Sequence, residues 1–124
     1  MPGVRENGGQ YTHAALWVTW AIRLMEQGDK AIKYYKYLTP IEHARTREIA
    51  NMYKVEPYVI VADMYGTSNL VGRGGWTWYT GSSSWYFKIG IEEILGLKIQ
   101  DNILSINPCI DSTWKEYTIK YKNA

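Results

Sequence analysis

The segment YTHAALWVTWAIRLMEQ, residues 11–27, decides the fold class of this chain. Apolar residues recur along it every three or four positions, the spacing of one face of an α-helix; they are Ala14, Ala15, Val18, Ala21, Ile22 and Met25. Four larger apolar residues widen that face well beyond a single stripe, namely Leu16, Trp17, Trp20 and Leu24. A helix this apolar must be covered on more than one side, so the segment predicts a helix inside a multi-helix assembly.

The segments that follow continue a mainly helical pattern as far as Gly96. We expect helices over residues 30–38, 57–65 and 82–95, the last of them ended by Gly96 at its C′ position. Residues 42–53 are charged and poorly periodic, so they predict a long loop with at most a helical turn. Residues 66–75 are rich in turn residues and predict a second loop.

Beyond Gly96 the apolar period changes from 3.6 to 2. Residues 97–100 and 103–106 flank Asp101-Asn102, a pair typical of a two-residue hairpin turn, and residues 117–122 alternate like a further strand. The chain is therefore predicted to be mainly α, with helices in pairs as far as residue 96 and a β tail over residues 97–124. So few strands and such apolar helices are marginal alone, so we expect a piece of something larger or burial by self-association.

Composition excludes several classes of protein. Fourteen Lys and Arg against twelve Asp and Glu give a net charge of +2, too weak a bias to indicate a nucleic-acid partner. No segment has the length and hydropathy of a membrane span or the pattern of a signal peptide. The single Cys109 excludes an internal disulfide, and one thiol with two histidines is a poor zinc set, so no metal is expected. A reducing cytoplasm fits this cysteine usage.

A glycine-rich loop, Arg5-Glu6-Asn7-Gly8-Gly9, precedes the first helix, whose first turn holds His13. Unpaired N–H groups at a helix start can bind an anion or a sugar hydroxyl. Glu6 could accept hydrogen bonds from two sugar hydroxyls, or it could be a solvated loop carboxylate. His13 could donate to a phosphate oxygen, or it could be a satisfied core histidine, and the two interpretations have similar weight.

A second glycine-rich loop covers residues 72–82, GRGGWTWYTGS, ahead of the last predicted helix. Thr80, Gly81 and the next N–H group could form a nest for an oxyanion, although an ordinary helix cap explains the same residues. Trp76 and Trp78 could stack on sugar rings, or they could wedge against the helices. The composition of six Trp and eleven Tyr against one Phe favours rings with a polar edge. Together the two loops predict a single site for a sugar and an oxyanion.

These loops resemble the signature of glycoside hydrolase family 94, which contains the cellobiose and chitobiose phosphorylases. Further stretches are similar to the same family in order and spacing; they are residues 55–59, 72–85, 94–97 and 106–110, followed by Trp114. Residues 9–15, 40–46 and 72–81 look most like the C-terminal phosphorylase-type region of cyclic β-1,2-glucan synthases. The resemblance implies the last helices of an (α/α)6 barrel over residues 1–96, followed by the start of a C-terminal β domain.

The resemblance also implies a reaction and roles for individual residues. Family members phosphorolyse β-glucosides reversibly with inversion, so inorganic phosphate is a co-substrate and no cofactor is expected. By this resemblance Glu6 holds the donor sugar and Arg5 borders the acceptor. His13, Thr80 and Gly81 bind the phosphate.

One family residue has no match in this chain. The family's general acid is an aspartate upstream of the first loop, so none of these 124 residues is expected to be catalytic. We therefore expect an inactive piece of a β-glucan phosphorylase or glycosyltransferase, its partners being glucan, phosphate and an upstream barrel segment. The alternative is a carbohydrate-binding or helical interaction module without turnover.

Overall fold

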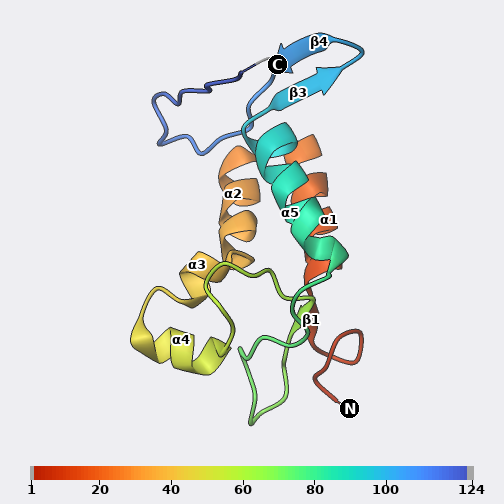
Figure 1. Ribbon diagram of the computed structural model, residues 1–124, viewed down its shortest axis with the longest axis vertical. Coiled ribbons are helices and arrows are strands. Elements are labelled where there is room, and N and C mark those ends of the chain that lie inside the picture. The colour runs from red at the N-terminus through yellow and green to blue at the C-terminus, as the bar shows by residue number, and fades with distance from the viewer. Residues whose placement is uncertain (1, 123–124) are drawn as a thin grey trace.

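The computed structural model describes residues 2–122, and its centre is a column of three packed helices (Figure 1). They are α1 (Thr12–Leu24), α2 (Gly28–Tyr37) and α5 (Gly81–Lys88), which continues as a π-helical segment, η1 (Ile89–Ile94). Helix α1 packs against both α2 and α5. Between the helices lies a small core of buried side chains, made of Leu16, Ile32, Ile89 and Ile94. The three principal helices expected here are thus confirmed, with ends that differ by a few residues.

Two short helices replace the long loop expected over residues 42–53, so that prediction was wrong. They are α3 (Pro40–His43) and α4 (Arg47–Tyr53). Pro40 occupies the first turn of α3, where its missing N–H group costs nothing. The side chain of Thr46 accepts a hydrogen bond from the N–H of Ile49 at 3.2 Å and so caps α4. A proline in the first turn of α3 and a side-chain cap on α4 therefore start helices whose sequences are too short and too charged to have a clear apolar period.

The helix expected over residues 57–65 is absent, because this segment runs mostly without regular structure and ends in a strand. Strand β2 (Asp63–Met64) pairs antiparallel with β1 (Gln10–Tyr11). Just before it, Ala62 accepts a hydrogen bond from the N–H of Thr12 and donates one to the carbonyl of Trp76. The backbone of this segment therefore bonds to neighbouring segments instead of to itself. The branched side chains of residues 59–61 also favour an extended chain.

The predicted hairpin is confirmed at the far end of the helical column (Figure 1). It consists of β3 (Leu97–Gln100) and β4 (Ile103–Ile106) in antiparallel register. Asp101 and Asn102 have φ angles of 50° and 64°, the positive values that a two-residue turn of this kind requires. The strand expected over residues 117–122 is wrong: this tail is irregular and is fixed where the hydroxyl of Tyr117 donates to the carbonyl of Leu95 at 2.8 Å.

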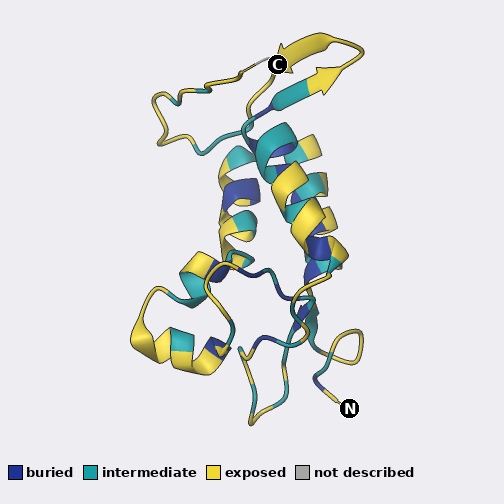
Figure 2. Cartoon of the chain, in the orientation of Figure 1, coloured by how far each residue is buried: buried dark blue, intermediate teal, exposed yellow. Residues whose placement is uncertain are grey.

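The outer faces of the helices remain exposed (Figure 2). On α1 and just beyond it, more than half of the surface of each of four large apolar side chains is exposed, namely Trp17, Val18, Leu24 and Met25. The packing within these residues therefore covers α1 on two sides only. Among residues 2–122 there is no helix long and apolar enough to cross a membrane.

Candidate functional site

Glycines allow the N-terminal loop to form a tight turn just before α1. The N–H of Gly9 donates to the carbonyl of Arg5 at 2.8 Å, and a Cβ on Gly9 would lie only 2.7 Å from the Arg5 nitrogen. Arg5 itself has a φ of 49°, a conformation that is rare for a residue with a side chain. Such backbone strain persists only where the surroundings enforce it. This turn places the side chains of Arg5 and Glu6 on the surface, where both are exposed.

His13 stands in the first turn of α1 with its ring among aromatic side chains. The ring centroid lies 4.8 Å from that of Trp17 and 5.8 Å from that of Trp85. Its Nε2 is buried and has no hydrogen-bond partner among residues 2–122. A buried polar atom without a partner costs free energy, so this imidazole is not a satisfied core histidine.

The start of α5 lies directly beside this imidazole. A Cβ built on Gly81 would be 3.5 Å from both Nδ1 and Cε1 of His13. The structure thus brings together His13 and Gly81, which are 68 positions apart in the sequence. The predicted convergence of the two loops is confirmed as geometry. The role of these residues in binding phosphate stays a prediction.

The hydroxyl groups on either side of Gly81 do not cap α5. Thr80 is the N-cap residue but makes no capping hydrogen bond with its side chain. Its Oγ1 lies 2.7 Å from the hydroxyl of Ser82, and the hydroxyl groups of these two residues donate to the carbonyls of Ile60 and Val61. The first N–H groups of α5 are therefore left free of side-chain caps, as an anion site requires. An ordinary side-chain cap, the alternative considered above, is absent from this end of α5.

Asp63 is a buried residue at this site that the sequence analysis missed. Only 2% of its side chain is exposed, and its Oδ1 lies 3.9 Å from Nε of Arg5. Oδ1 also accepts a hydrogen bond from the N–H of Trp76 at 3.3 Å, whereas Oδ2 has no partner in the described part of the chain. A lone carboxylate inside the apolar run of residues 59–64 was the available signal, since unpaired buried carboxylates are rare.

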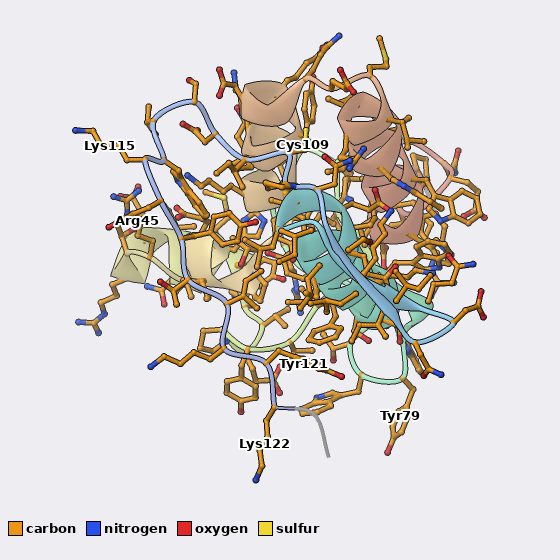
Figure 3. All side chains as sticks on the ribbon, turned by 90° about the horizontal axis from the view of Figure 1, so that it is seen from above. Arg45, Tyr79, Cys109, Lys115, Tyr121 and Lys122 are labelled. Carbon is orange, nitrogen blue, oxygen red and sulfur yellow. The ribbon has the colours of Figure 1, made fainter. Side chains whose placement is uncertain are left out.

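The aromatic residues of the second loop form an exposed cluster. The indole N–H of Trp76 donates to the carbonyl of Trp78 at 3.2 Å, and the ring of Tyr58 meets that of Trp78 edge-on. Trp78 and Tyr79 both have positive φ angles, 57° and 50°. Tyr79 projects from the edge of the molecule (Figure 3). The exposure of Trp76 and Trp78 suits stacking on a sugar ring and rules out the alternative that they are wedged between these helices.

The surroundings of the four aspartates bear on the expectation that none of them is a general acid. Asp63 is paired with Arg5, Asp29 accepts from the N–H and hydroxyl of Ser112, and Asp101 lies in the hairpin turn. Hydrogen bonds from Thr113 lower the pKa of Asp111, whereas a general acid needs a raised pKa. Residues 2–122 also contain no group of three potential metal ligands.

An open, mainly apolar groove of about 770 Å³ lies beside α1 and α2. Its lining combines Val18 and Tyr34 of these helices with Gly8, Gly9 and Gly72 of the two glycine-rich loops. His13, Thr80 and Gly81 do not line it. An apolar groove with so few polar groups suits packing against another helix better than it suits an anion. The candidate anion site is therefore placed at His13 and Gly81, outside this groove.

Comparison with known proteins gives a consistent result. The family model of the glycosyl hydrolase 94 superfamily, catalytic domain, matches residues 1–96. The chain is 48% identical over 121 residues to the cyclic beta-(1,2)-glucan synthase NdvB of Rhizobium meliloti (strain 1021), which covers 98% of this chain and 4% of that protein. It is 32% identical over 118 residues to the N,N'-diacetylchitobiose phosphorylase of Vibrio proteolyticus, covering 94% of this chain and 14% of that protein. The solabiose phosphorylase of Paenibacillus borealis is 27% identical over 121 residues, with 97% and 15% covered. The chain thus spans only a small part of the length of each relative.

Proposed function

Since this chain belongs to the glycosyl hydrolase 94 superfamily, we propose that it supplies the phosphate side and the donor-sugar side of an inverting β-glucan phosphorylase or glycosyltransferase. The 48% identity to a cyclic β-1,2-glucan synthase favours β-1,2-linked glucose as the substrate. Residues 1–96 would be the last helices of an (α/α)6 barrel, and residues 97–124 would begin the β domain. The exposed apolar face of α1 supports this arrangement, because earlier barrel helices would cover it.

The observation that carries the proposal is the buried, unpartnered Nε2 of His13 beside the start of α5. An imidazole N–H and the free N–H groups of a helix start are all donors, and phosphate oxygens accept from both. Thr80 adds a hydroxyl, and Gly81 leaves space where a side chain would stand. Inorganic phosphate is therefore the co-substrate that we assign to His13, Thr80 and Gly81, and no cofactor is invoked.

The sugar would lie along the other exposed groups of the two loops. Glu6 is exposed, and its side chain makes no ion pair among residues 2–122. A free carboxylate can accept hydrogen bonds from two neighbouring hydroxyls of the donor glucosyl unit. Arg5 would border the acceptor, and Trp76 and Trp78 would stack on glucosyl rings.

The proposed reaction is the direct displacement that inversion requires. A phosphate oxygen forms a bond to the anomeric carbon while the bond from that carbon to the leaving oxygen breaks, and a carboxylic acid protonates the leaving oxygen. The ion pair of Asp63, the hydrogen bonds of Asp29 and the lowered pKa of Asp111 support an acid from another segment. We therefore assign the acid to a segment outside these 124 residues and expect no turnover by the 124-residue polypeptide alone. A cytoplasmic location belongs to the same proposal and rests on cysteine usage.

The first experiment follows the two imidazoles by NMR while inorganic phosphate is added. The chain has two histidines, and His43 is a built-in control because its Nε2 already lies 2.8 Å from the carbonyl of Tyr37. We expect the His13 resonances to move with saturation and those of His43 to stay fixed. His13→Gln should abolish the response. Phosphate shifts of equal size at both rings would refute a site at His13.

The second experiment restores the missing acid by mixing. The chain is combined with a segment that carries the earlier barrel helices of the 48%-identical relative, and release of glucose 1-phosphate from sophorose-type oligosaccharides is measured. We expect activity in the complex and none from either part. A folded complex that binds phosphate at His13 but stays inactive would overturn the catalytic part of the proposal. Sugar binding that is independent of phosphate would then favour a carbohydrate-binding module.

A further inference from the structure

The side chain of Asp63 meets both glycine-rich loops of the site. Its Oδ1 faces Nε of Arg5 in the first loop and accepts from the N–H of Trp76 in the second. A Cβ on Gly75 would overlap with the carboxylate, so glycine at that position is what lets the backbone approach it so closely. The segment holding Asp63 pairs in addition with β1, at Tyr11.

The two charged groups of this ion pair, the Arg5 guanidinium and the Asp63 carboxylate, differ in their exposure to solvent. The side chain of Arg5 is 50% exposed and that of Asp63 is 2% exposed. A buried carboxylate needs a compensating charge, and Arg5 is the cation within 4 Å of Asp63 among residues 2–122. Arg5 turns its Nε toward Asp63, and the planar guanidinium has two terminal nitrogens besides Nε. Asp63 is the carboxylate that Arg5 pairs with among residues 2–122.

We propose that Asp63 is a specificity-determining residue that neutralises Arg5 so that its terminal nitrogens bind uncharged sugar hydroxyls and do not capture phosphate. This inference rests on the function proposed above. A guanidinium next to a buried carboxylate keeps the N–H donors of its terminal nitrogens, while the carboxylate offsets its positive charge. Without the carboxylate the same group would be a free cation, and phosphate would compete with sugar for it. Asp63 thereby keeps phosphate at His13 and Gly81 and reserves Arg5 for the acceptor sugar.

The test is Asp63→Asn in the 124-residue chain, titrated separately with sophorose and with inorganic phosphate in a calorimeter. Asparagine keeps the shape and the acceptor for the Trp76 N–H but removes the charge. We expect sophorose affinity to fall about tenfold, since Arg5 loses its fixed orientation. We also expect a second phosphate site, weaker than the first, whose affinity falls as the salt concentration rises. A merely structural role would weaken both ligands and would create no new phosphate site.

Two further variants complete the design. Arg5→Gln should weaken sophorose binding without a new phosphate site, and it should abolish that site when combined with Asp63→Asn. Asp101→Asn is the matched control, because it makes the same chemical change in an exposed turn at the opposite end of the molecule (Figure 1). It should leave both affinities unchanged.

The outcomes separate this inference from the proposed function. An Asp63→Asn chain that folds and binds both ligands like the wild type would overturn the inference alone. A wild-type chain that does not bind phosphate at His13 would instead refute the proposed function. The inference about Asp63 would still be tested by whether Asp63→Asn gains phosphate binding at Arg5. Should Asp63→Asn fail to fold, Arg5→Gln decides, because wild-type sophorose affinity in that variant would overturn the inference.

Discussion

Gly81→Ala should separate phosphate binding from stability. Gly81 is the first residue of α5, its backbone is helical, and its Cβ would meet His13 at 3.5 Å, an ordinary van der Waals distance. The alanine methyl group therefore fits without strain in the empty chain. Replacing glycine by alanine in a helix stabilises a protein by up to about 0.5–1 kcal/mol. We expect unchanged or slightly raised stability toward urea.

The same methyl group should exclude the ligand. It would stand between the His13 imidazole and the first N–H groups of α5, where the proposal puts a phosphate oxygen. Losing one hydrogen bond to a charged group costs about 1.5–3 kcal/mol. At about 1.4 kcal/mol per tenfold change, this corresponds to a loss of affinity of about 10- to 150-fold.

The assay is the imidazole NMR titration with inorganic phosphate, paired with urea unfolding of the same samples. Ser84→Ala is the matched control, because it adds helix propensity in the same exposed turn without adding bulk beside His13. A Gly81→Ala chain that folds normally and binds phosphate as tightly as the wild type would refute the assignment of the site. Equal losses in both variants would refute it too, since the effect would then be unrelated to the space beside His13.

Four further predictions concern stability and association. Burial and the charge of Glu56 raise the pKa of Tyr53 to about 12, so stability that is intact below pH 10 should fall as the pH rises from 10 to 12; Tyr53→Phe should remove up to about 3 kcal/mol of that loss in alkaline urea titrations. A Cβ on Gly90 would overlap with the Tyr35 hydroxyl, so Gly90→Ala should cost about 1–3 kcal/mol and regain part of it when combined with Tyr35→Phe. Glu93 is buried between Nε of Arg23 at 3.0 Å and Nζ of Lys98 at 2.7 Å. Glu93→Gln should lower the free energy of unfolding in urea by about 3–5 kcal/mol, because both cations would lose their counter-charge. The wild type should associate as its concentration rises, and Val18→Lys on the exposed face of α1 should reduce the association measured by light scattering.

The segments that were predicted correctly carry their signals locally. Helix α1 follows from its apolar period, and the hairpin follows from a turn pair that tolerates positive φ angles. The family prediction is confirmed as well, because it rested on motifs along most of the chain. Helix α4 was missed for a local reason too: its cap on Thr46 could be identified, but seven residues are too few for an apolar period to emerge.

Asp63 was overlooked because its importance depends on contacts that no local pattern contains. Its partners Arg5 and Trp76 come from two other segments, and only the fold brings them to the same carboxylate. Two of the alternatives weighed for the candidate residues are decided by similar long-range facts. The unpartnered Nε2 of His13 excludes a satisfied core histidine, and the exposure of Trp76 excludes a wedge within this helical column.

Residues 57–65 were predicted to form a helix, and a helix at this place could not have joined the two glycine-rich loops. A helix satisfies its own backbone and would offer no free carbonyls in its interior. The actual segment presents the carbonyls of Ile60 and Val61 to the hydroxyls of Thr80 and Ser82 at the start of α5. It also presents the carbonyl of Ala62 to the N–H of Thr12 at the start of α1. The first turns of α1 and α5, which hold His13 and Gly81, are thus both hydrogen-bonded to the consecutive carbonyls of residues 60–62. The two loops meet because this segment is not a helix, and any substitution that promoted helix formation here would pull them apart.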